Sequence, residues 1–136
     1  MSTLAVGIDL VDIDEVRESV QRFGDRYLFR VYSASEVAYA QTSEHECAAR
    51  LAARFAAKEA VIKLLAPVEE PIPWRDIEVC RAPSGQSHIS LSGAAKRLAE
   101  ERRMGQISLS LAHHGRTAIA MAAALANSNE AEPSCP

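Results

Sequence analysis

The sequence predicts an α+β fold in which a long central helix packs on a mostly antiparallel sheet. Three features carry this prediction: an apolar run at residues 4–13, an alanine-rich run at 47–66 without glycine or proline, and a pair of apolar segments around the HHGR turn at 113–116. The first and third have the β-branched content or alternation of strands. The second consists of strong helix formers.

Length and composition favour one folded domain. The chain has 136 residues, 48% hydrophobic and 24% charged, which suits a single compact core. We assign the domain to residues 1–125 and read the polar segment 126–136 as a disordered tail. The net charge of -3 and 5% aromatic content argue against nucleic-acid binding.

Cysteine use and hydropathy indicate the compartment. Cys47, Cys80 and Cys135 form no CxxC pair and no zinc-ligand spacing, so we expect reduced thiols. No segment has the roughly 20 consecutive apolar residues that cross a bilayer, and the N-terminus lacks a signal-like run. These features predict a cytoplasmic protein without a membrane partner.

Local signals divide the chain into further elements. Asp12 or Asp14 can cap a helix over 15–23 that stops at Gly24, and a second helical stretch begins at Ser35 and Glu36. The remaining predictions are strands at 77–81 and 88–91, a turn at 83–85, a helix at 93–103, and a hairpin of strands at 107–111 and 117–125.

Asp9 is the first candidate for chemistry. It lies in the middle of the strand at 4–13, which is apolar on both of its faces. A buried carboxylate needs a cation or several hydrogen bonds to offset its lost hydration. From the residues alone, a metal site and backbone hydrogen bonds at a bulge near Gly7 are equally acceptable explanations.

The helix at 47–66 carries its charges in two narrow stripes. One contains Arg50, Arg54 and Lys58, and the other contains Glu59 and Lys63. Glu59 and Lys63 could form an ordinary ion pair, but the apolar helix offers little solvated surface. A phosphate-bearing ligand and a magnesium ion on the carboxylates Asp9 and Glu59 would balance both stripes.

Three motifs resemble those of the holo-acyl-carrier-protein synthase family of phosphopantetheinyl transferases. They are GIDLVDI at 7–13, RFAAKEAVIKLL at 54–65 and SLAHHGRTAIA at 110–120, in the family's order and spacing. The resemblance spans roughly residues 4–125, and the middle motif is the most specific of the three.

The resemblance implies transfer of 4'-phosphopantetheine from coenzyme A to a serine of an apo acyl carrier protein, with release of adenosine 3',5'-bisphosphate. Asp9 and Glu59 would hold Mg2+ at the diphosphate and Lys63 would contact the same phosphates. Glu59 would also be the candidate base for the serine hydroxyl. Arg54, His113 and Gly85 would bind the nucleotide end of coenzyme A, although histidines in a turn are usually only solvated.

The family also implies a homotrimer whose sites lie between subunits, with His113 and Gly85 facing Asp9 and Glu59 of another chain. Glu15 departs from the family, which usually has arginine there, where the acidic carrier docks. Gln86 and Ser87 after Gly85 depart as well. Two other functions therefore stay open: a non-catalytic homologue that binds coenzyme A or a carrier, and another magnesium-dependent activity on a nucleotide diphosphate.

Overall fold

The computed structural model describes residues 2–127 and has the α+β fold that the sequence predicts. Its helices are α1 (Ile13–Phe23), α2 (Asp25–Val31), α3 (Ala34–Gln41), α4 (Cys47–Leu65), the short 3-10 turn η1 (Trp74–Asp76) and α5 (Gly93–Glu101). Its strands are β1 (Ser2–Asp12), β2 (Ile77–Arg81), β3 (Ser87–Leu91), β4 (Ser108–His114) and β5 (Thr117–Asn127). No helix in this part of the chain is long and apolar enough to cross a membrane.

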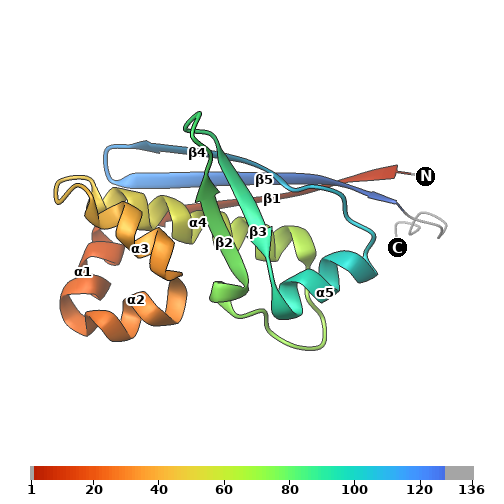
Figure 1. Ribbon diagram of the computed structural model, residues 1–136, viewed down its shortest axis with the longest axis horizontal. Helices are drawn as coiled ribbons and strands as arrows, with labels where there is room; N and C mark the ends of the chain where they lie inside the picture. The colour runs from red at the N-terminus through yellow and green to blue at the C-terminus, as the bar shows by residue number, and fades with distance from the viewer. Residues whose placement is uncertain (1, 128–136) are drawn as a thin grey trace.

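The strands form two antiparallel sheets instead of one. The larger sheet has the order β1-β5-β4, and the smaller one is the β2-β3 hairpin. The α-helices all lie on one side of the larger sheet, with α4 running along it (Figure 1). The register aligns Asp9 with Ala120 and Ala120 with Leu111, so residues 9 and 111 share one face of the sheet.

Close contact between α4 and β1 depends on small residues. A Cβ atom on Gly7 would lie 1.9 Å from the carbonyl oxygen of Ala60, so only glycine permits this approach. The helix turns its alanines inward, as Ala52, Ala56, Ala57 and Ala60 have no exposed surface. The prediction that this helix is largely buried is confirmed, and Asp9 is thereby brought beside it.

The first helix, α1, was predicted better than the short helix at 25–31. Asp12 caps α1 by accepting hydrogen bonds from the amides of residues 14 and 15, so α1 begins at Ile13 and not at Glu15. Gly24 ends α1 as expected, but α2 follows it immediately and was not predicted. Seven residues are too few to show a helical period.

The C-terminal part follows the prediction with shifted boundaries. Helix α5 ends at Glu101, because Arg103 adopts the left-handed conformation with φ of 53°. Strand β5 extends to Asn127, so positions 126 and 127 belong to the sheet and not to a tail. The rest of the predicted tail, with Cys135, lies outside the described residues.

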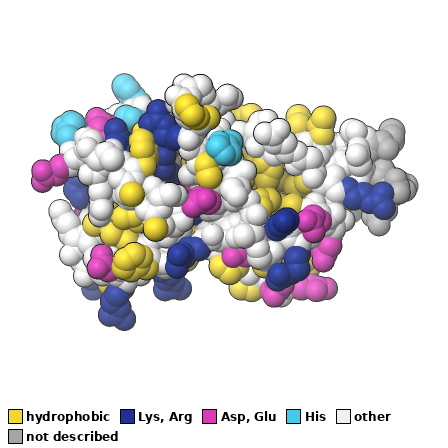
Figure 2. Space-filling view, viewed as in Figure 1, with side chains coloured by type: hydrophobic (Ala, Val, Ile, Leu, Met, Phe, Trp, Pro, Cys, Tyr) yellow, Lys and Arg dark blue, Asp and Glu magenta, His cyan; other side chains and the backbone are white. Residues whose placement is uncertain are grey.

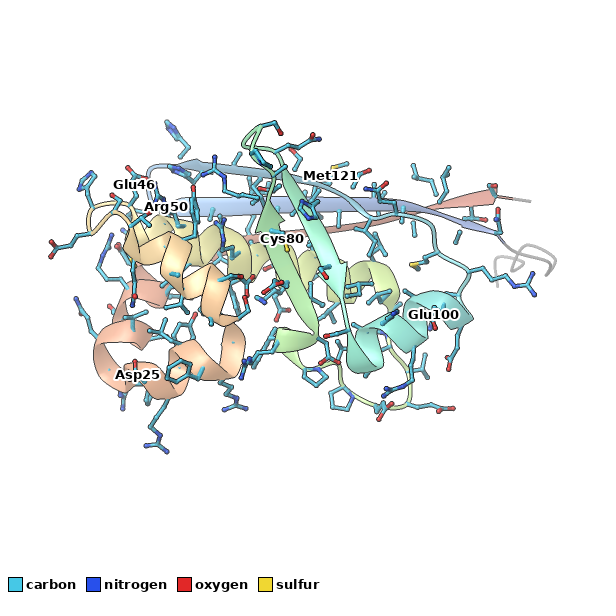
Figure 3. All side chains as sticks on the ribbon, in the orientation of Figure 1. Asp25, Glu46, Arg50, Cys80, Glu100 and Met121 are labelled. Atoms are coloured by element: carbon cyan, nitrogen blue, oxygen red, sulfur yellow. The ribbon has the colours of Figure 1, made fainter. Side chains whose placement is uncertain are left out.

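The face of the larger sheet opposite α4 is apolar and exposed; we call it the open sheet face. Its side chains are 48% to 64% exposed and are Leu4, Val6, Ile8, Leu10, Met121 and Leu125. Met121 lies on this side of the sheet, away from α4 (Figure 3). Contiguous apolar surface of this kind usually marks an interface between proteins.

Candidate active site

Asp9 forms an ion pair with Lys63. The Lys63 Nζ atom donates to Asp9 Oδ1 at 2.8 Å and to the backbone carbonyl of Ile8 at 3.0 Å. The Asp9 side chain is 18% exposed, whereas that of Lys63 is 54% exposed and can reach a ligand in solvent. The expected burial of Asp9 is therefore partial, and its neutralising charge in this state comes from Lys63.

Glu59 lies one helical turn before Lys63 on α4, so both side chains point toward the same side of the helix. Its Oε1 atom accepts a hydrogen bond of 2.7 Å from the indole Nε1 of Trp74. The Trp74 ring in turn packs against Phe55, with ring centroids 5.9 Å apart. Trp74 thus fixes the Glu59 carboxylate, an orienting contact that the sequence motifs did not reveal.

A second group of predicted residues meets at a cavity of about 340 Å³. Its polar and charged lining residues are Tyr39, Glu46, Arg50, Arg54, Arg81, Ser87 and His113, with the β2–β3 turn at Gly85 beside them. Figure 2 shows Lys and Arg side chains close to His side chains at this end of the molecule, where α4 begins. We call this cavity the basic pocket.

Arg54 is the buried member of the basic pocket. It is 4% exposed, and its Nε atom has no hydrogen-bond partner among the described residues. Burial lowers the pKa of this guanidinium, while Tyr39 and Glu36 act in the opposite direction. A buried donor without a partner is unusual and indicates that a ligand completes the site.

Helix α4 separates the two groups within one chain. Arg54 faces the β4 side through the basic pocket, whereas Lys63 reaches β1 on the other side. Five residues separate Arg54 from Glu59, which turns their side chains about 140° apart around the helix. One chain therefore brings Arg54, Gly85 and His113 together, and Asp9 and Lys63 together beside Glu59, but keeps the two groups apart.

Residues 5–122 match the family model described as the 4'-phosphopantetheinyl transferase superfamily. The chain belongs to this superfamily. The match runs from within β1 to within β5, so it includes α4, the β2–β3 turn and β4, which carry the residues of both groups together with Asp9 on β1. The family expected from the three sequence motifs is thereby confirmed.

Named relatives of this transferase agree with the family. The holo-(acyl-carrier-protein) synthase of Moorella thermoacetica is 41% identical over 119 residues, which cover 88% of this chain and 91% of the relative. A solved Chronobacterium ammoniagenes ACPS–CoA complex has a TM-score of 0.80 at 33% identity, covering 93% and 99% of the two chains. A Helicobacter pylori holo-(acyl-carrier-protein) synthase in complex with coenzyme A has a TM-score of 0.75 at 28% identity, covering 88% and 98%.

The carboxylates of this transferase fit the magnesium ion that the sequence motifs imply. No group of three or more metal-binding side chains of His, Cys, Asp or Glu exists among residues 2–127. Magnesium does not need one, since it keeps several waters and commonly binds one or two protein carboxylates together with substrate phosphates. Asp9 and Glu59 supply only oxygen donors, and each already accepts a hydrogen bond that a cation could replace.

One expectation about the basic stripe is wrong. Lys58 is not available to a phosphate, because it is fully buried and its Nζ lies 2.9 Å from Glu36 Oε1. It also donates to the backbone carbonyls of Trp74, at 3.1 Å, and of Ile77. Burial lowers the pKa of Lys58, and the charge of Glu36 offsets only part of this decrease. Lys58 therefore joins α4 to α3 and to the start of β2, and its role is structural.

Proposed function

We propose that this chain is a holo-acyl-carrier-protein synthase, which transfers 4'-phosphopantetheine from coenzyme A to a serine of an apo acyl carrier protein. The observation that carries the proposal is the agreement of the relatives: synthases of the same name match it over most of their length. The carboxylates Asp9 and Glu59, placed beside Lys63, give the chain the groups that such chemistry requires.

The proposed roles follow from charge and position. Asp9 and Glu59 would hold Mg2+, which when bound neutralises the diphosphate of coenzyme A. Lys63 would release Asp9 and turn to the same phosphates, since its side chain is half exposed. Glu59 would accept the proton of the carrier serine while the serine oxygen attacks the phosphorus that bears pantetheine. The bond to the leaving adenosine 3',5'-bisphosphate then breaks, and the cationic groups stabilise its charge.

Arg54, His113 and Gly85 would bind the nucleotide end of the same coenzyme A molecule. Because α4 stands between these residues and Asp9, we propose that a second copy of the chain supplies the basic pocket. The homotrimer implied by the sequence motifs would provide this arrangement through one repeated head-to-tail contact. The open sheet face supports such an assembly, since it is the apolar surface that neighbouring copies would cover.

Introducing a charge into the open sheet face tests the assembly. Ile8→Glu is expected to convert the oligomer to a smaller species in sedimentation velocity, because the carboxylate would otherwise be buried between subunits. The fold should persist, since Ile8 is 55% exposed within one chain. Val68→Glu is the matched control, at an 87% exposed loop position. An unchanged sedimentation coefficient for Ile8→Glu would rule out this face as the interface.

The remaining proposals concern carrier and compartment. Cys47 and Cys80 are free thiols, which a reducing cytoplasm would maintain. Glu15 is exposed at the first turn of α1, and Asp14 beside it pairs with Arg17 and Arg116. We propose that the partner is an acyl carrier protein of a fatty-acid pathway or of a specialised polyketide or peptide pathway. We propose no membrane or nucleic-acid partner.

The direct test is intact-mass measurement of apo carriers after incubation with the chain, coenzyme A and Mg2+. The carrier should gain the mass of one phosphopantetheine group only when enzyme, coenzyme A and metal are all present. Carriers from fatty-acid, polyketide and peptide pathways should be compared. Coenzyme A binding without an adduct on any carrier would favour the non-catalytic homologue instead.

A further inference from the structure

Tyr39, on the last turns of α3, lies at the centre of three arginines. The guanidinium carbons of Arg50, Arg54 and Arg81 lie 4.5, 4.3 and 4.7 Å from the centroid of its ring. All four residues line the basic pocket. We call them the Tyr39 cluster. Each guanidinium is within the range in which a cation is attracted to an aromatic ring.

Hydrogen bonds hold the guanidiniums in place around Tyr39. Arg50 donates to the Tyr39 carbonyl at 3.1 Å and to Thr42 Oγ1 at 2.7 Å. Arg81 donates to the Tyr39 hydroxyl, and Arg54 donates to the Arg50 carbonyl at 3.4 Å. Tyr39 therefore contacts one arginine through its backbone, one through its hydroxyl and all three through its ring.

The cluster has more positive charge than its surroundings balance. None of the ion pairs formed within residues 2–127 includes Arg50, Arg54 or Arg81. Glu46 lies beside Arg50 at the start of α4 and lines the same pocket, and it is the single carboxylate there (Figure 3). Three like charges around one ring repel each other, so an anion with several charges would stabilise them.

We propose that Tyr39 is a positioning residue that holds the three arginines as one receptor for a phosphomonoester, and so determines specificity for the 3'-phosphate of coenzyme A. This inference rests on the proposed function. Coenzyme A carries a diphosphate and, separately, a 3'-phosphomonoester. With Asp9, Glu59 and Lys63 assigned to the diphosphate, the second phosphate is the anion left for the Tyr39 cluster. A dianion accepting from several guanidiniums matches the unpartnered Arg54 Nε donor.

The test compares coenzyme A with 3'-dephospho-coenzyme A as substrates of the full chain. For Tyr39→Leu, we expect KM for coenzyme A to rise about tenfold or more with little change in kcat, because the arginines lose their shared platform. KM for the dephospho analogue should stay nearly constant, so discrimination between the two falls by the same factor. Tyr39→Phe keeps the ring under all three arginines and loses only the hydrogen bond from Arg81 to the hydroxyl, so most discrimination should return.

Controls separate positioning from general damage and from failure of the proposed function. Tyr27→Phe also removes a tyrosine hydroxyl, one that contacts Tyr32 and not the pocket, and should leave discrimination unchanged. Calorimetric titration with adenosine 3',5'-bisphosphate tests the cluster even if no carrier is modified, and wild type should bind it more tightly than Tyr39→Leu. If Tyr39→Leu does not fold, Arg81→Gln must show the same selective loss. Equal losses for both substrates, or unchanged affinity for the bisphosphate, would overturn the proposal.

Discussion

Replacing Asp9 or Glu59 by alanine is expected to reduce carrier modification by about a hundredfold or more at any magnesium concentration that supports the wild type. Each variant would lose one of the two carboxylates proposed to hold the metal. The measurement is the rate of phosphopantetheine addition by intact mass, across a magnesium titration. Isothermal titration with Mg2+ and coenzyme A should show the same loss in binding.

Both variants should remain folded. The Asp9–Lys63 pair is open to solvent on the side of Lys63, which is 54% exposed, so its removal should cost at most about 1 kcal/mol of unfolding free energy. Glu101→Ala provides a matched control, because it removes an exposed helical glutamate that belongs to neither group of site residues, and it should keep full activity. Wild-type rates for Asp9→Ala or Glu59→Ala would refute the assignment of the metal carboxylates.

Lys58→Met is expected to destabilise the chain strongly, by about 3 to 5 kcal/mol, because it leaves the Glu36 carboxylate buried without its partner. Both side chains are fully buried, and Glu36 also accepts hydrogen bonds from the amides of Ser33 and Val79. The measurement is the free energy of unfolding obtained from urea denaturation. Lys96→Met, an exposed lysine on α5, should shift it by no more than about 0.5 kcal/mol.

The double variant distinguishes a coupled pair from two independent sites. Adding Glu36→Gln to Lys58→Met removes the uncompensated charge, so it should recover at least about 1 kcal/mol relative to Lys58→Met alone. If the two losses simply add, Lys58 and Glu36 do not depend on each other.

Elements with strong local signals were predictable. The apolar strand at residues 4–13 and the alanine-rich run at 47–66 became β1 and α4, with no end shifted by more than two residues. Helix α2 was missed, because its seven residues show no period after Gly24. The single sheet expected from the pattern divides into two, since strand patterns do not show which strands pair.

The sequence motifs assign Asp9 and Lys63 to the same phosphates, but the helical spacing offered Glu59 as the ion-pair partner of Lys63, whereas the partner in the structure is Asp9. Reasoning along one helix failed for Lys58, because its partner Glu36 comes from α3 and the spacing within α4 cannot reveal it. Only two of the four residues in the Tyr39 cluster could be grouped from the sequence, for the same reason. Arg50 and Arg54 follow each other on α4, but Tyr39 and Arg81 reach them only in the folded chain.

The central structural claim is that one active site takes its carboxylates from one copy and its basic pocket from another. Mixing two inactive variants tests it most directly: Glu59→Ala, and Arg54→Ala combined with His113→Ala, unfolded together and refolded as mixed oligomers. Carrier modification should return to about a quarter of the wild-type rate. In oligomers assembled at random from equal amounts of the two variants, about a quarter of the interfaces join intact carboxylates of one copy to an intact basic pocket of the other. If each variant is refolded alone and the two kinds of oligomer are then combined, the mixture should stay inactive. No recovery in the mixed oligomers would contradict a site shared between copies.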